Sequence, residues 1–453
     1  MPRQGRRRSF ATILLLILGV ALVVRVAFVV FVARDDNHFY DAAYYELQAR
    51  TIADGHGYTD PFQYLPGHPH RALPSAQHPP LTVLALVPVA WIGNELGVTD
   101  KTSQTAMRIE IALVGLLGVA LIGLLGREVA GDRTGLVAAG IAAVYPYLWV
   151  NDGLIMSEAF AVVLVTVAML LTLRIASGPT LWKALALGLV CGLAALARAE
   201  LILLAPLFGI PLLWAFRGVP WGRRLAAVAL VGAGTVAVLA PWIGYNLSRF
   251  QDPIFVSTND GIALLGSNCP SVYRGGGTGL TDLSGCIPKN PPKGDDSVAS
   301  TVYRHRATHY MRDHAGRLVA VELARIGRDW GVFRPGDMLS FGVNEGRPRW
   351  VTGLGMVVYY PLVLLGIAGV VLLRRRKIRQ WPLLMPPLVV TVATVVSFGQ
   401  TRFRVPAEPS IVVLASVTIV AIVSRWWPGE QAAADQADSA PAPSSAIEAS
   451  SSS

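Results

Sequence analysis

The sequence predicts an all-α polytopic membrane protein, a bundle of about ten transmembrane helices. Two observations predict this fold class. Hydrophobic residues make up 53% of the 453 residues and charged residues only 15%, whereas soluble domains average about 25% charged residues. The apolar residues also form blocks of about 17 to 24 residues, the length with which a helix crosses about 30 Å of hydrocarbon. A water-soluble globular protein is therefore excluded.

Basic clusters between the apolar blocks predict which blocks cross the membrane, because Lys and Arg are enriched on the cytoplasmic side. If every block crossed from a cytoplasmic N-terminus, the clusters at 217–224 and 374–379 would lie outside. If block 79–96 does not cross, each of these clusters becomes cytoplasmic. That block opens with two prolines and contains a third, so we expect it to lie at the interface or to re-enter the membrane without crossing it. The blocks are 10–32, 79–96, 104–126, 134–150, 154–174, 181–197, 200–216, 224–244, 351–373, 381–399 and 406–425.

This arrangement predicts one membrane domain over residues 1–425, in the plasma membrane, with both termini in the cytoplasm. The outer side holds a first loop, 34–103, and a long loop, 245–350. The segment 426–453 is rich in Ala, Ser, Pro and acidic residues, which predicts a disordered tail. The net charge of +10, from 39 basic and 29 acidic residues, is explained by the clusters at block ends, so we expect no nucleic-acid partner.

Two carboxylates on the predicted outer side are candidates for catalysis. Asp41 shares a helical face with Tyr44 and Tyr45; a carboxylate beside aromatic rings suits sugar binding, although an ordinary solvated acid is equally compatible with the spacing. Glu158 opens a predicted span on the same side. The pair could share acid–base chemistry or hold a divalent metal ion. Alternatively, Glu158 only stabilises a helix N-terminus.

Two arginines, Arg402 and Arg404, precede the last span on the outer side, against the positive-inside pattern. Guanidinium groups match the geometry of phosphates, so we expect an anionic phosphate to bind there. Arg198 and Glu200 lie in a tight outer hairpin, where a structural ion pair is the simpler interpretation. Arg25 lies inside the first span, and the pattern does not decide whether it reaches the interface or pairs with an acid.

Cysteine and histidine positions complete the set of candidates. Cys269 and Cys286 share the long outer loop, where a disulfide suits an oxidising compartment; two free thiols are the alternative. His78 precedes the two prolines of block 79–96, and a loop histidine of this kind is more often solvated than a metal ligand. The glycines at 275–277 are not followed by the Lys of a P-loop, so a nucleotide-driven machine is not expected.

Several short motifs of this sequence resemble those of a known enzyme family. Short motifs in order along nearly the whole chain, apart from the tail, resemble GT-C membrane glycosyltransferases of the family 39/83 type, relatives of protein O-mannosyltransferases and of the lipid A aminoarabinose transferase. They are Asp41 with Tyr44 and Tyr45, Gly55-His-Gly57-Tyr58, His78-Pro-Pro-Leu81, Gly126-Arg127, Ser157-Glu158, Arg198, Pro241-Trp242 with Asn246, Ser257 to Gly261 with Asn268, and Arg402-Phe-Arg404-Val-Pro406.

The resemblance implies a GT-C-like bundle and specific roles for some of these residues. Asp41 matches the essential Asp of the family's first outer loop, and Glu158 stands where the family has a second acid. His78, Arg198 and Asn246 would bind substrate. Two positions depart from the family pattern: Gln77 replaces an acid that binds metal in the aminoarabinose transferase, and Tyr245 replaces an Arg. These departures put the metal site and one phosphate or sugar contact in doubt.

The resemblance therefore implies a glycosyltransferase that moves a hexosyl or pentosyl group from a polyprenyl-phosphate donor. The acceptor would be a hydroxyl of a glycan, lipid or protein on the outer face, and direct displacement would invert the anomeric configuration. Two alternatives belong to other classes. A transporter or flippase for lipid-linked sugars would need polar residues through the middle of the membrane, whereas most ionisable groups here cluster at the outer face. A non-catalytic subunit of an envelope assembly would use the same face for contacts alone.

Overall fold

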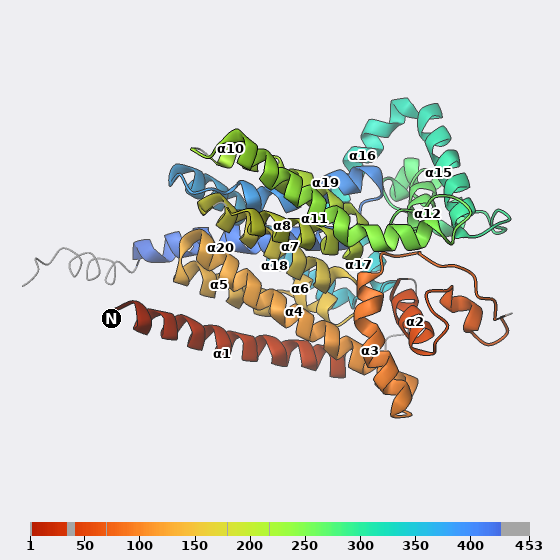
Figure 1. Ribbon diagram of the computed structural model, residues 1–453, viewed down its shortest axis with the longest axis horizontal. Coiled ribbons are helices and arrows are strands. Elements are labelled where there is room, and N and C mark those ends of the chain that lie inside the picture. Colours follow the sequence, from red (N-terminus) through yellow and green to blue (C-terminus); the bar gives the residue numbers. More distant parts are fainter. Residues whose placement is uncertain (1, 34–40, 69, 179, 217, 427–453) are drawn as a thin grey trace, which may run out of the picture.

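The computed structural model describes residues 2–33, 41–68, 70–178, 180–216 and 218–426, and helices dominate them (Figure 1). The predicted tail lies outside these residues, apart from residue 426. The long helices are α1 (Pro2–Phe31), α4 (Asp100–Ala130), α7 (Glu158–Ser177), α11 (Trp221–Leu247), α18 (Arg349–Arg375) and α20 (Glu408–Trp426). Shorter helices complete the bundle: α5 (Asp132–Val144), α6 (Pro146–Asp152), α8 (Leu181–Ala197), α9 (Leu204–Gly209), α10 (Leu212–Ala215) and α19 (Trp381–Val396).

The remaining helices gather at one end of the bundle (Figure 1). They belong to the two long loops that the sequence predicts on the outer side. The helices of this end are α2 (Asp41–Ala53), α3 (Leu81–Glu95), α12 (Asn259–Gly266), α13 (Pro270–Tyr273), α14 (Leu283–Cys286), α15 (Asp296–Asp313), α16 (Ala315–Asp329) and α17 (Pro335–Val343). Short 3-10 turns are η2 (Pro61–Tyr64), η3 (Ala199–Leu203), η4 (Gly275–Gly277) and η5 (Thr401–Ala407).

The fold confirms an all-α polytopic membrane protein, with fewer full-length spans than the apolar blocks predict. Among the described residues, six helices are long and apolar enough to cross a membrane, and α5 with α6, bent by 59°, would make a seventh. Three of the ten expected spans are shorter apolar helices instead: α8, α19 and the segment Ala199–Ala215. Prolines explain part of this, since Pro206 and Pro211 lie in the segment that breaks into η3, α9 and α10. Helix α3, from block 79–96, has only 15 residues.

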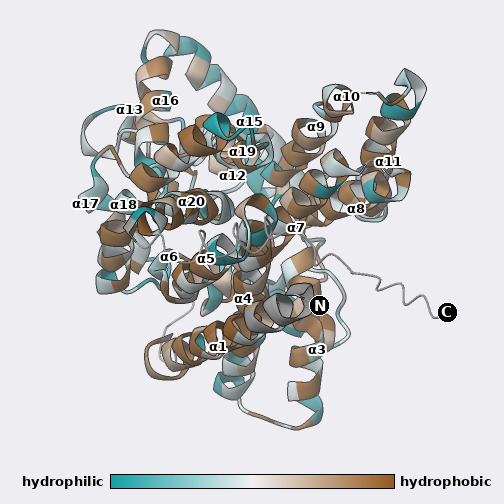
Figure 2. Cartoon of the chain, turned by 90° about the vertical axis from the view of Figure 1, so that its left-hand side faces the viewer, coloured by the Kyte–Doolittle hydropathy of each residue, from teal (hydrophilic) through white to brown (hydrophobic). Residues whose placement is uncertain are grey.

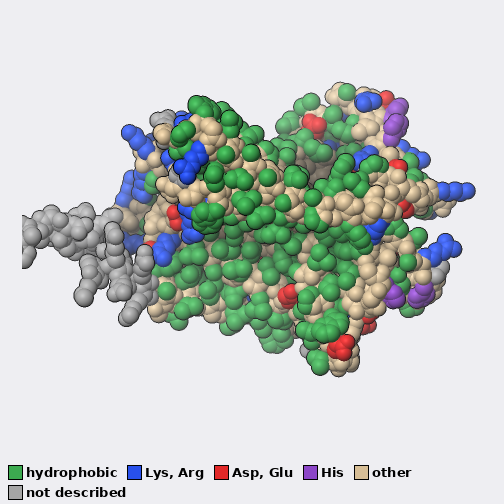
Figure 3. Space-filling model, viewed as in Figure 1, with side chains coloured by type: hydrophobic (Ala, Val, Ile, Leu, Met, Phe, Trp, Pro, Cys, Tyr) green, Lys and Arg blue, Asp and Glu red, His purple; other side chains and the backbone are tan. Residues whose placement is uncertain are grey.

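The surface of the bundle has the polarity that a lipid environment requires. Hydrophobic side chains form a broad belt across its middle, and Lys and Arg concentrate towards the two ends (Figure 3). Hydrophobic residues also cover much of α1 in the end-on view (Figure 2); Leu15, Leu16 and Val23 on this helix are each 68% exposed. An exposed apolar face of this extent is stable only against lipid or another protein.

Small residues let the helices of the bundle approach closely. A Cβ atom added to Gly188 of α8 would lie 2.2 Å from the carbonyl oxygen of Val231 on α11. A Cβ atom added to Gly234 of α11 would lie 2.7 Å from the carbonyl oxygen of Leu185 on α8, and the Thr235 hydroxyl donates a hydrogen bond to the Gly188 carbonyl at 3.1 Å. Such backbone contacts are how membrane helices gain packing energy where burial from water contributes little.

The structure assigns a partner to Arg25. Its Nε lies 2.7 Å from Oδ2 of Asp152 at the end of α6, and both side chains are almost fully buried. The guanidinium also donates to the carbonyl oxygens of Ala21 and Ala143. Gly115 on α4 makes room for this pair, because a Cβ atom there would lie 2.1 Å from Cγ of Asp152. Arg25 therefore joins α1 to the bent α5–α6 element and does not extend to the interface.

Cys269 and Cys286 form a disulfide in the long loop, with Cα atoms 5.9 Å apart. The bond joins α13 to α14, two helices of four residues each. A covalent link across 17 residues limits the freedom of this segment in the unfolded chain. It braces one wall of the cavity described next.

Candidate active site

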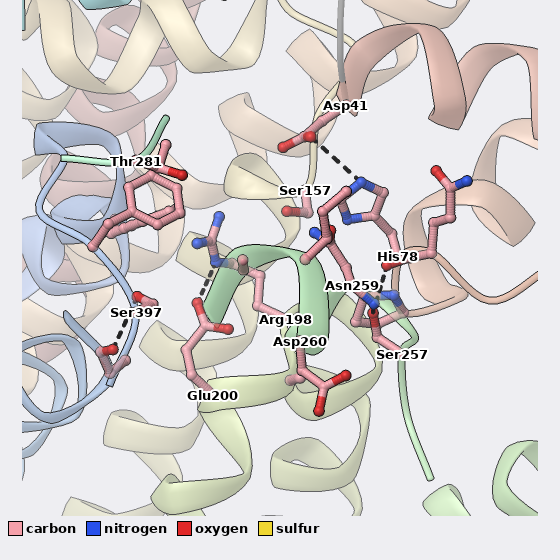
Figure 4. Close-up of a pocket in the computed structure, with 18 of the residues that line it drawn as sticks. Asp41, His78, Ser157, Arg198, Glu200, Ser257, Asn259, Asp260, Thr281 and Ser397 are labelled. Atoms are coloured by element: carbon pink, nitrogen blue, oxygen red, sulfur yellow. Dashed lines mark hydrogen bonds and ion pairs between the residues drawn. The ribbon is translucent and has the colours of Figure 1, made fainter. Parts of the chain in front are cut away.

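A cavity of about 910 Å³ opens at the loop end of the bundle. Segments far apart in the sequence meet around it: the start of α2, the turn before α3, the start of α7, the hairpin between α8 and η3, the α11–α12 loop, α19 and η5. Figure 4 shows side chains from several of these segments pointing towards one space. A pocket of this size, apolar on one side and with convergent polar groups, is the usual form of a binding site for a small molecule.

Asp41 begins α2 and reaches into the cavity. Its Oδ2 accepts a short hydrogen bond from Nη2 of Arg402, and its Oδ1 lies 3.4 Å from Nε2 of His78 (Figure 4 draws the second contact). Burial would raise the pKa of Asp41, but the adjacent Arg402 and His78 hold it well below its ordinary value. The carboxyl group is therefore ionised at neutral pH, with one quarter of the side chain exposed to the cavity.

Aromatic rings fix His78 beside Asp41. The His78 ring lies 5.2 Å from the ring of Tyr44 and 4.9 Å from that of Tyr45, and both tyrosines line the cavity. Tyr44 is anchored in turn by a hydrogen bond of 2.9 Å between its hydroxyl and Oγ of Ser75. The two residues after His78 are prolines, and Pro80, with helical dihedral angles of φ −80° and ψ −16°, is the N-cap of α3. The helical spacing that placed Asp41, Tyr44 and Tyr45 on one face thus leads to one wall of the cavity.

Glu158 is the first residue of α7 and one of the most buried acids in the site. Three guanidinium groups surround its Oε1: Arg198 at 3.3 Å, Arg402 at 3.6 Å and Arg347 at 3.7 Å. Arg198 also pairs with Glu200 at 2.7 Å, as expected from the hairpin (Figure 4). Glu158 is therefore more than a helix-terminal acid, because it neutralises arginines from three other segments of the chain.

Arg402 is the centre of the charge network. Its Nη2 donates to Asp41, its Nη1 lies 3.0 Å from Oε1 of Glu345, and Nη1 also contacts the sulfur of Met156 at 3.5 Å. Arg402 lies in η5, the 3-10 segment that leads directly into α20. Only 11% of the side chain is exposed. The one arginine thus links Asp41, Glu158 and Glu345.

Sequence reasoning missed Glu345 and Arg347. They lie in a tight turn after α17, where Gly346 has a φ of +78° and the Glu345 amide donates to the Gly342 carbonyl at 3.1 Å. Arg347 contacts Oε2 of Glu345 at 2.6 Å and donates to Oδ1 of Asn151 at 2.8 Å. No periodic pattern or motif marks these residues. The available signal was the charged sequence Glu-Gly-Arg immediately before an apolar span.

Two predicted substrate-binding residues lie away from the cavity. Arg404 is fully buried two residues after Arg402, where it pairs with Glu408 at 2.8 Å and lies 3.5 Å from the ring centre of Tyr359. The 3-10 geometry of η5 places its side chain on another side of the segment. Asn246, near the end of α11, is also fully buried and accepts a hydrogen bond from Arg249 at 3.2 Å. Arg404 and Asn246 therefore contact other protein side chains, although we expected both to bind substrate.

The site residues do not fit the alternative in which Asp41 and Glu158 together hold a divalent metal ion. Among the described residues, no group of three or more His, Cys, Asp or Glu side chains is arranged to bind a metal. Arg402 contacts both carboxylates, which places a positive charge where a metal would have to bind. A cation beside a guanidinium group is unfavourable. No step of the chemistry below passes through a metal.

An apolar wall continues from the charged end of the cavity. It consists mainly of residues of α19 and the η3 turn, and Val392 and Val396 of α19 are 43% and 60% exposed. The apolar lining residues of this wall are Leu203, Val390, Val392, Ala393, Val396 and Phe398. The cavity thus has a charged end and a hydrophobic end.

Comparisons with known proteins agree with this architecture. The protein-family model described as dolichyl-phosphate-mannose-protein mannosyltransferase matches residues 77–245. The archaeal oligosaccharyltransferase AglB from Archaeoglobus fulgidus, solved with an inhibitory peptide and a dolichol-phosphate, aligns with a TM-score of 0.52 at 14% identity. The alignment covers 95% of this chain and 52% of that one. The apo form of the Archaeoglobus fulgidus enzyme gives a TM-score of 0.54 at 16% identity, with 96% and 52% covered.

The chain has the GT-C fold. The resemblance found in the sequence is thereby confirmed at the level of the fold. The chain spans about half the length of the archaeal enzyme. ArnT from Cupriavidus metallidurans bound to undecaprenyl phosphate is a more distant likeness, with a TM-score of 0.42 at 16% identity over 96% of this chain and 81% of that one. No curated protein sequence matches the chain.

Proposed function

We propose that this protein is a membrane glycosyltransferase that transfers a sugar from a polyprenyl-phosphate donor to an acceptor hydroxyl. The observation that carries the proposal is the meeting of Asp41 and Arg402 in one cavity. An ionised carboxylate there lies beside a guanidinium group that is suited to a phosphate. The GT-C fold and the apolar wall of the cavity support the same assignment. We assign the site to the outer face because it lies opposite the basic clusters of the bundle.

The chemistry follows from the charges of the site. The donor phosphate binds at Arg402, and the acceptor hydroxyl lies against the free side of Asp41. The acceptor oxygen forms a bond to the anomeric carbon while the bond from that carbon to the phosphate oxygen breaks, and the electron pair leaves with the polyprenyl phosphate. The hydroxyl proton passes to the Asp41 carboxylate. Attack opposite the leaving group inverts the anomeric configuration.

Arg402 and Asp41 have complementary roles in this step. The guanidinium stabilises the charge that grows on the departing phosphate in a site with little water, where such stabilisation is strongest. A phosphate leaving group needs no proton, so one carboxylate suffices, unlike the two that glycoside hydrolases use. Glu158 keeps the arginines in place, and Tyr44, Tyr45 and His78 form the wall against which the sugar packs.

The cavity also has room for the lipid and the acceptor. We assign the isoprenoid chain to the apolar wall of α19 and η3, because this wall is the hydrophobic end of the cavity. The opposite rim carries Asn259, Asp260 and Arg304 from α12 and α15, and Asp260 lies 3.1 Å from Arg304. These groups are partly exposed and can hydrogen-bond a hydroxylated acceptor. The rim is equally suited to a glycan, a glycolipid or a hydroxylated peptide.

The proposal is tested by changing Asp41 to Asn in a deletion strain. Wild type, Asp41→Asn and the control Asp132→Asn would be expressed at equal levels in the membrane. Asp132 pairs with Arg127 at the opposite end of the bundle. Mass spectrometry of envelope glycans, glycoproteins and polyprenyl-phosphate sugars should show a sugar that the deletion loses and that wild type and Asp132→Asn restore. Asp41→Asn should restore less than about one hundredth of it, within the range typical of a lost general base. Full restoration by Asp41→Asn would disprove the mechanism.

A further inference from the structure

Three carboxylates of the protein surround the guanidinium of Arg402. Nη2 donates a hydrogen bond to Asp41 and Nη1 lies 3.0 Å from Oε1 of Glu345, whereas the buried Nε has no hydrogen-bond partner among the described residues and lies 3.6 Å from Oε1 of Glu158. A phosphate that binds both Nη1 and Nη2 through two oxygens therefore has to replace Asp41 or Glu345. This conflict is inherent in the arrangement, because the same arginine balances the site's own acids.

Of the three carboxylates, Glu345 is the one that a phosphate can most readily displace from Arg402. Only its Oε1 contacts Arg402, whereas its Oε2 is held by Nη1 of Arg347 at 2.6 Å and accepts a hydrogen bond from Nε2 of Gln400. If the Oε1 contact breaks, two partners still neutralise and anchor the carboxylate. Glu158 sits deeper and is 1% exposed, and Asp41 must stay at the face that meets the acceptor.

We propose that Glu345 occupies the donor's phosphate subsite in the free protein, so that the donor phosphate displaces it from Nη1 of Arg402. This inference rests on the proposed function, because it assumes that Arg402 binds the donor phosphate. Glu345 thereby acts as a positioning residue that keeps Arg402 aimed at the cavity before the donor arrives. It also weakens binding of every anion that cannot replace it, which makes it a determinant of specificity for phosphate.

The turn that carries Glu345 supports such an exchange. Glu345 lies on the turn that connects α17 to α18, so it belongs to neither helix. Gly346 in the same turn has a positive φ. Its side chain lines the cavity, and 10% of it is exposed. Arg347 behind it is anchored on Oδ1 of Asn151 in α6, so the second partner of Glu345 stays in place when Arg402 turns to the phosphate.

The experiment measures binding of undecaprenyl phosphate, without a sugar, to the purified full-length protein in detergent. Glu345→Gln keeps the shape and removes the competing charge, so its Kd should fall by about tenfold or more, the scale expected for losing a repulsive charge at contact distance. Glu200→Gln is the matched control. Glu200 also lines the cavity and pairs with an arginine, but that partner is Arg198. Its Kd should stay within about threefold of wild type, since a more distant charge is screened.

The pH dependence provides an independent readout. Burial raises the pKa of Glu345, which faces Arg402, Arg347, Asp41 and Glu158. As pH falls from neutral, Glu345 takes up a proton and loses its hold on Arg402, so wild type should approach the affinity of Glu345→Gln. Comparing the two proteins at each pH cancels the titration of the phosphate itself. Melting temperatures check that each variant is folded, and undecaprenol, which lacks the phosphate, should bind all of them alike.

Each outcome is decisive. A tighter Kd for Glu345→Gln alone, with a gap from wild type that closes at low pH, supports the inference. If wild type binds undecaprenyl phosphate and Glu345→Gln binds it equally or more weakly, the inference is wrong while the proposed donor site stands. The same holds if Glu200→Gln tightens binding as much. If no variant binds the lipid phosphate better than undecaprenol, the proposed donor site is wrong and the inference fails with it.

Discussion

Two arginines separated by one residue have different environments, which gives a test at the scale of the residue. Arg402 lines the cavity, whereas Arg404 is buried against Glu408 and Tyr359. Arg402→Lys keeps the charge but loses the planar fork, so transfer should fall by about 100-fold, as for other lost transition-state donors. Arg404→Lys should lower the melting temperature and leave undecaprenyl phosphate binding per folded molecule unchanged. Equal losses of binding in both variants would show that Arg404 also contributes to the donor site.

Residue chemistry was only partly predictable from the sequence. Asp41, Tyr44, Tyr45, His78 and Arg402 were found because they share a helical face, a motif or an unusual place in the charge pattern. Arg404 has the same unusual place in the charge pattern as Arg402. Only the 3-10 geometry of η5 distinguishes them, because it places the Arg404 side chain away from the cavity. Glu345 was missed because its place depends on a glycine turn and on η5, some 55 residues later, and no local periodicity encodes such a contact.

The ion pair between Arg25 and Asp152 gives a test at the scale of the element, because it joins α1 to the α5–α6 bend. Arg25→Met leaves Asp152 buried without its partner and should cost about 3 to 5 kcal/mol of stability. The double variant Arg25→Met with Asp152→Asn removes the stranded charge, so it should melt at a higher temperature than Arg25→Met alone. Thermal unfolding in detergent would measure both. Simply additive losses would indicate that the two side chains do not stabilise each other.

Helical elements were predicted well where the apolar blocks were long, even where α11 and α18 contain the prolines Pro241 and Pro361. Helices α1, α4, α7, α11 and α18 occupy the blocks expected for them. In the other blocks, hydropathy predicts a longer helix than the backbone forms. Residues 199–215 are apolar apart from Glu200, yet Pro206 and Pro211 remove two amide donors from the segment, which divides into three short helices. Hydropathy measures transfer into lipid and carries no information about such breaks.

At the scale of the whole molecule, the charge pattern orients the bundle. The end away from the cavity carries the start of α11 with Arg223 and Arg224 and the end of α18 with Arg374 and Arg375. The cavity end carries the disulfide and the helices α15 and α16. Arginines at the ends of short loops are retained in the cytoplasm, and a disulfide persists in an oxidising compartment. Both arguments support the proposed location of the cavity on the outer face.

Single cysteines would test this orientation with little background, because Cys191 is buried and the other two cysteines are bonded to each other. Gly222 in α11 and Gly316 in α16 are exposed, and a Cβ atom at either meets no other atom within 4 Å. In intact cells, a membrane-impermeant maleimide should label Gly316→Cys at once and Gly222→Cys only after permeabilisation. The reverse pattern would place the cavity in the cytoplasm, where a donor presented on the outer leaflet could not reach Arg402. Transfer would then have to use a donor still on the side where it is made.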